Sequence, residues 1–107
     1  MPIPKRFLKF IGEFPRVAKA YEELGDSVHA AGPLTEKERA LVKLGISIGA
    51  RLEGAVHSHV RKALGAGLKK EHLQHVALLS LPTIGLPSMM AALSWIDDVV
   101  AAKKKRK

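Results

Sequence analysis

The sequence predicts an all-α fold, a small multi-helix bundle that assembles as an oligomer, and three observations point to this class. No segment of the 107 residues keeps a strict apolar–polar alternation, and β-branched residues are sparse, so we find no convincing strand. Apolar residues instead recur three and four positions apart, which is the spacing of one helix face. Capping patterns and Gly–Pro breaks then divide the chain into helical segments.

The chain is expected to form one helical domain over residues 1–102, followed by a basic tail at 103–107. Pro2 and Pro4 indicate an irregular start. A first helix is predicted over 15–30, with Pro15 in its first turn, where proline is favoured. Its apolar residues follow helical spacing until Gly32-Pro33 ends it; they are Val17, Ala20, Tyr21, Leu24 and Val28.

The second helix is expected to follow Thr35, because Thr35 and Glu38 form a Thr-x-x-Glu capping box. Apolar residues cover most of its circumference, which predicts a central position in the bundle. Gly45 and Gly49 would let another helix approach closely. The apolar residues are Leu41, Val42, Leu44, Ile46 and Ile48.

A third helix is predicted over about 52–66, ending at Gly67, where a left-handed cap is usual. A fourth helix should run over about 69–81. A turn at 82–86 then leads to a long last helix that starts at Pro87 and ends near 102. The apolar stripe of the third helix consists of Val56, Val60, Ala63 and Leu64.

The formal charge of +8 includes five positive residues at 103–107, so the rest of the chain carries 8 − 5 = +3. The basicity therefore lies mostly in a tail, which we interpret as a solvated terminus. No aromatic residues are interleaved with it, so nucleic-acid binding is not expected. Cysteine is absent, which excludes a disulfide, a thiolate nucleophile or a cysteine metal site in this sequence. With no signal peptide at its start, a cytoplasmic protein is expected.

No Asp, Glu, Lys or Arg occurs in the 24 residues from Leu73 to Ile96. That length would span a bilayer. Pro82, Gly85 and Pro87 interrupt the stretch, however, so we predict two buried helices joined by a turn and no membrane insertion. One small domain cannot easily bury so much apolar surface, and a homo-oligomer interface is the natural place for the remainder.

The segment 53–59, Glu-Gly-Ala-Val-His-Ser-His, is the densest group of candidate catalytic residues. Residues two apart lie about 200° apart around a helix, so His57 and His59 cannot share one ligand. His59 falls on the apolar stripe, either as a buried acid–base group or as a structural histidine. Glu53 and His57 are four apart and share a face with Arg61, which predicts a solvated pair.

The fourth helix carries His75, which is expected to face inward, and His72, which is expected to be exposed. The helix with Glu53 and His57 can supply at most two ligands to a metal ion, so a third would have to come from elsewhere, such as His75 or His29. We therefore expect no metal and no cofactor. Asp97 and Asp98 are expected to pair with the basic tail. Trp95, Met89 and Met90 have the spacing of core or interface residues.

Four motifs in order resemble those of the carboxymuconolactone decarboxylase family. The segment from His59 to Gly67 resembles its His-x-x-x-Ala-Leu-x-x-Gly helix, and residues 70–73 look like its following helix start. Gly85-Leu86-Pro87, with Ala91 and Ala92, is similar to its Gly-x-Pro turn and final helix. Residues 35–50 look like its first core helix, so the resemblance covers about residues 33–100.

This resemblance implies an all-α fold in trimers or hexamers, with the site at subunit or helix-pair contacts. The family includes a lactone decarboxylase and an alkylhydroperoxidase D type, a thiol peroxidase that uses Cys-x-x-Cys, a histidine and a glutamate. His59 matches the family histidine. The cysteine positions fall on Leu52 and Ala55, which excludes peroxidase chemistry of that type.

Three functions remain open at this stage. The first is a lyase-type enzyme or small-molecule binder with His59, Glu53 and His57 as catalytic residues; Arg61 and His75, and alternatively Arg51, would bind substrate. The second is a non-catalytic oligomeric module that keeps the fold without the cysteines. The third is an acidic-surface or nucleic-acid binder that acts through the tail.

Overall fold

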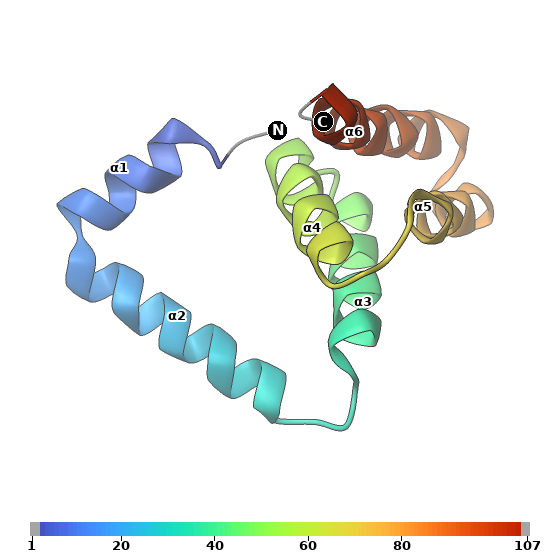
Figure 1. The fold of residues 1–107 in the computed structure, drawn as a ribbon. Helices are drawn as coiled ribbons and strands as arrows, with labels where there is room; N and C mark the ends of the chain where they lie inside the picture. Colours follow the sequence, from blue (N-terminus) through green and yellow to red (C-terminus); the bar gives the residue numbers. More distant parts are fainter. Residues whose placement is uncertain (1–2, 106–107) are drawn as a thin grey trace. The chain divides into compact units, whose positions relative to one another are not determined.

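The computed structural model describes residues 3–105, within which it contains six helices and no strand (Figure 1). The all-α prediction is confirmed. The helices are α1 (Lys5–Glu13), α2 (Pro15–Ala30), α3 (Glu36–Gly49), α4 (Glu53–Gly65), α5 (Lys70–Ile84) and α6 (Leu86–Lys105).

The chain divides into two compact units, with the boundary between Leu34 and Thr35. The first unit consists of α1 and α2. The predicted bounds of α2 are confirmed, whereas α1 occupies the start that was expected to be irregular. The ring of Phe10 in α1 lies 6.2 Å from that of Phe7 in the same helix and 6.1 Å from that of Phe14, the residue between the two helices. Neither helix has a buried residue, and the apolar stripe of α2 is exposed.

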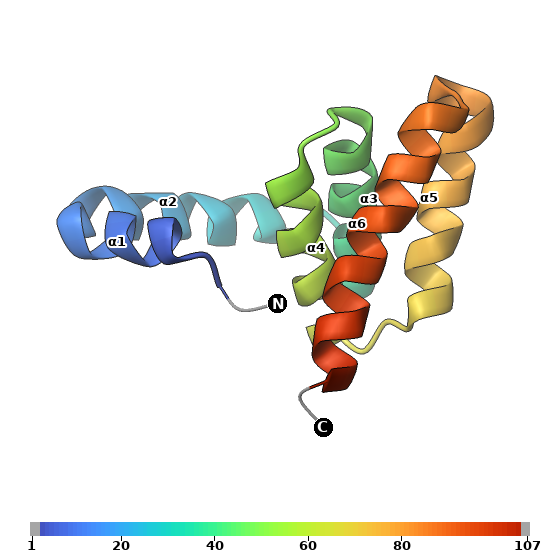
Figure 2. The ribbon, with the colours of Figure 1, turned by 90° about the horizontal axis from the view of Figure 1, so that it is seen from above.

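In the second unit, the four helices α3, α4, α5 and α6 pack around one shared apolar core (Figure 2). α5 and α6 run side by side in opposite directions, and α4 packs against both α3 and α6. The predicted stripe of α4 is confirmed, because Val56, Val60 and Ala63 are fully buried. They meet residues of the other three helices, including Leu44, Ile48, Leu73, Ala77, Ala92, Ile96 and Val99.

α3 begins at the predicted capping box. Thr35 N donates to Glu38 Oε1 at 2.8 Å, and Glu38 N donates to Thr35 Oγ1 at 3.2 Å. Its predicted central position is wrong for the single chain, because Val42 is 48% and Ile46 66% exposed. Three neighbouring helices bury only one side of α3. These two side chains belong to the apolar surface that the single chain exposes.

Two turns of this unit require glycine. Gly67 has a φ of 94° and follows α4, which confirms the predicted left-handed cap. Gly85 has a φ of 98° and connects α5 to α6. The predicted turn over 82–86 is wrong in its first part, because α5 continues through Pro82 to Ile84. Proline removes one backbone donor on an exposed part of the helix, where the unpaired carbonyl can be hydrated.

The uncharged stretch forms most of α5 and the first half of α6, as predicted. In the part of the chain that the structure describes, none of the helices is long and apolar enough to cross a membrane. Much of the stretch is nevertheless exposed in the single chain. The exposed residues include Leu78, Leu79, Leu81, Ile84, Leu86 and Met90. Of the basic tail, residues 103–105 continue α6, while Arg106 and Lys107 lie outside the described residues.

Candidate functional site

The two histidines of α4 lie on opposite edges of its buried stripe. Successive residues are about 100° apart around the helix axis, which places His57 next to Leu64 at one edge of the stripe and His59 next to Ala63 at the other. The sequence predicted a solvated His57 and a core-facing His59. The structure corrects this, since His57 is only 8% exposed and His59 is half-buried. The cause is α6, which covers the His57 edge of the helix.

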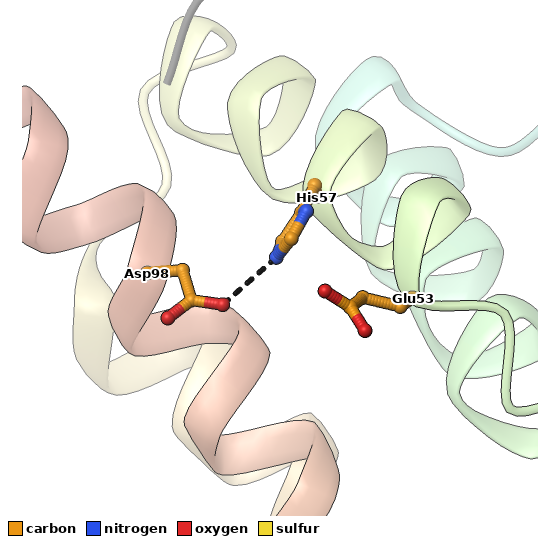
Figure 3. A group of neighbouring side chains, drawn as sticks. All are labelled: Glu53, His57 and Asp98. Carbon is orange, nitrogen blue, oxygen red and sulfur yellow. Dashed lines mark hydrogen bonds and ion pairs between the residues drawn. The ribbon is translucent and has the colours of Figure 1, made fainter.

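His57, Asp98 and Glu53 form a cluster between α4 and α6 (Figure 3). His57 Nε2 lies 3.0 Å from Asp98 Oδ2, within hydrogen-bond distance. Glu53 is the first residue of α4, one turn before His57, and its carboxylate points toward the other two (Figure 3). One ligand atom from each residue lies within 4.8 Å of the others. The arrangement can hold and transfer a proton, or it can hold a cation.

Sequence reasoning missed Asp98 as the partner of His57. It expected Asp98 to pair with the basic tail, most of whose side chains lie outside the described residues; among the described residues, the Asp98 carboxylate lies within hydrogen-bond distance of His57. The two residues are 41 positions apart, so only the packing of α6 on α4 brings them together. The exposed Asp98 side chain, 45% accessible, connects the buried imidazole to solvent.

His59 has different surroundings, which combine partial burial with nearby positive charge. Burial, then the ammonium groups of Lys62 and Lys43, lower the pKa of His59 from 6.5 to about 4. Burial and the charges of Lys62 and Arg39 also lower the pKa of Lys43. The imidazole is therefore neutral near pH 7, with a lone pair that can accept a proton. A neutral base among cations suits an anionic ligand.

The structure does not bring the predicted substrate-binding residues into one site with these histidines. His75 is exposed, which contradicts the expected inward position. Together with His72 it lines an apolar groove of about 470 Å³ between α3 and α5, and neither His57 nor His59 lines that groove. Arg61 is half-buried on α4, and Arg51 is exposed in the α3–α4 connection with a φ of 57°.

A family model described as the carboxymuconolactone decarboxylase family matches residues 15–98, which is 84 of the 107 residues. The match begins with α2 and ends at Asp98, so it includes both histidines of α4 and the whole Glu53–His57–Asp98 cluster. Neither a curated protein nor a solved structure matches the chain.

Proposed function

Because the chain belongs to the carboxymuconolactone decarboxylase family, we propose that it is a lyase-type protein that acts on a small carboxylated molecule, with His59 as its base. The observation that carries the proposal is the setting of His59. Its half-buried imidazole lies near two ammonium groups, Lys62 on its own helix and Lys43 on α3. The chain has no cysteine, so the chemistry proceeds without a thiol.

Proton transfer beside a carboxylate or a lactone carbonyl has two requirements. A base must reach the proton, and a cation or donor must stabilise the oxygen that gains charge. His59 meets the first requirement, and Lys62 and Lys43 supply positive charge for the second. Glu53 and His57 lie on the other side of α4, so their role in this step would be to support the helix rather than to touch the same ligand.

We propose further that the protein acts as a homo-oligomer, a trimer or a hexamer. Support comes from the apolar side chains that the single chain leaves exposed on α3, α5 and α6. Contiguous apolar surface of this kind marks interaction sites in soluble proteins.

The proposal can be tested by turnover of five-membered lactones that carry one carboxylate, with product formation followed by NMR. His59→Gln should remove activity and leave the oligomer intact in light scattering. His75→Gln is a matched control on α5 that should keep activity. If the wild type neither binds nor converts such lactones while remaining oligomeric, the non-catalytic module replaces this proposal.

A further inference from the structure

We propose that Glu53, His57 and Asp98 bind a divalent first-row transition metal ion, with Zn²⁺ as the representative. This inference is independent of the proposed function, because the cluster lies on the opposite edge of α4 from His59. The sequence provided only two ligands from one helix, which argued against a metal. The fold adds Asp98 of α6 as a third ligand, which gives the three protein ligands that are usual in catalytic zinc sites.

The spacing of the ligand atoms suits a metal ion. Two ligands about 2.1 Å from zinc lie about 3.0–3.4 Å apart when they subtend about 90–110° at the ion. His57 Nε2 and Asp98 Oδ2 already have a separation of 3.0 Å. Glu53 needs only a rotation of its exposed side chain, because its oxygen is within 4.8 Å of both.

The imidazole is the most constrained of the three ligands. His57 is 8% exposed, packed between α4 and α6, and presents Nε2 to the two carboxylates (Figure 3). A buried ligand of fixed orientation lowers the cost of ordering the site when the ion binds. Two carboxylates converge on this imidazole in a chain with a formal charge of +8, which makes the cluster a local centre of negative charge.

The ligand types select the metal. Imidazole favours zinc, iron, nickel and copper, whereas magnesium and calcium prefer oxygen ligands alone. Three protein ligands leave at least one coordination position open, which is the arrangement of catalytic rather than structural zinc sites. Both carboxylate residues are exposed, so the open position would face solvent and be reachable by a small ligand.

The test is titration of ZnCl₂ into the full chain after treatment with a chelator, followed by calorimetry. We expect one ion per chain, and binding at least about tenfold weaker in Glu53→Gln, His57→Gln and Asp98→Asn. Asp97→Asn removes the neighbouring carboxylate of α6 and His72→Gln removes an exposed histidine, and both should retain the wild-type affinity. Circular dichroism checks that each variant is folded.

Co²⁺ provides a second readout, since its visible absorption reports on nitrogen and oxygen ligands at the ion. The spectrum should change in Glu53→Gln and Asp98→Asn, whose side chains are exposed and whose folding is checked by circular dichroism. The proposal is overturned if these two variants bind Zn²⁺ as the wild type does, or if the Asp97 and His72 controls weaken binding equally.

Discussion

The contact between His57 and Asp98 should contribute measurably to stability, and a double-mutant cycle can isolate it. A hydrogen bond to a charged group contributes about 1.5–3 kcal/mol when it is buried. The Asp98 side chain is 45% exposed, so screening by water should reduce the coupling to about 1 kcal/mol. Unfolding free energies of the wild type, His57→Ala, Asp98→Ala and the double variant give this coupling directly.

Urea denaturation followed by circular dichroism is the appropriate assay, at one protein concentration and with a chelator present. The concentration must be fixed because association raises apparent stability, and the chelator removes any contribution from a bound metal. The pair of His57→Ala and Asp97→Ala is the matched control, since Asp97 is exposed and lies one residue away on α6. Additivity of His57→Ala and Asp98→Ala within about 0.3 kcal/mol would refute the reasoning.

Three further predictions concern the core, a helix cap and His59. Leu44→Ala should lower the free energy of unfolding by about 2–5 kcal/mol, because the Leu44 side chain is fully buried. Ile46→Ala should change the stability of the monomer by less than about 0.5 kcal/mol, because the Ile46 side chain is 66% exposed. Urea denaturation at low protein concentration distinguishes the two variants. Thr35→Ala should cost about 1 kcal/mol in the same assay through loss of the capping box, and an unchanged midpoint would argue against it. NMR should find the pKa of His59 at about 4, below its usual 6.5, and Lys62→Met should raise it. As the pH falls from 6.5 to 4, His59 binds a proton in the unfolded chain but not in the folded chain, so the free energy of unfolding should decrease over this window. A measured pKa of 6.5 would contradict the burial of the ring.

Local signals in the sequence were sufficient to predict most helices. Thr35 and Glu38 fixed the start of α3, and Gly67 fixed the end of α4, because caps and left-handed turns depend on neighbouring residues. Pro82 misled the prediction, since a proline near the end of an exposed helix can be accommodated without ending it. Pro4, interpreted as part of an irregular start, instead precedes the first turn of α1.

The candidate site was harder to predict than the helices. Periodicity placed His59 on the apolar stripe and His57 on a solvated face, but it could not determine which edge of the helix another helix would cover. α6 covers the His57 edge and brings Asp98 to it, a contact between residues 41 positions apart. The exposed apolar residues of α5 agree with the expectation that one small domain cannot bury the whole uncharged stretch. Those of α3 were predicted to lie at the centre of the bundle, because a sequence pattern does not show which face of a helix its neighbours cover.

The proposal that His59 serves a site for carboxylated molecules is tested most directly by NMR of the ¹⁵N-labelled histidine rings during titration with a carboxylated lactone. We predict that the ring signals of His59 shift saturably in the wild type. The shift should weaken in Lys62→Met, which removes the neighbouring charge on α4. If the lactone leaves the His59 signals unchanged, or moves only those of His72 and His75 beside the apolar groove, the ligand site is elsewhere and the account of His59 is wrong.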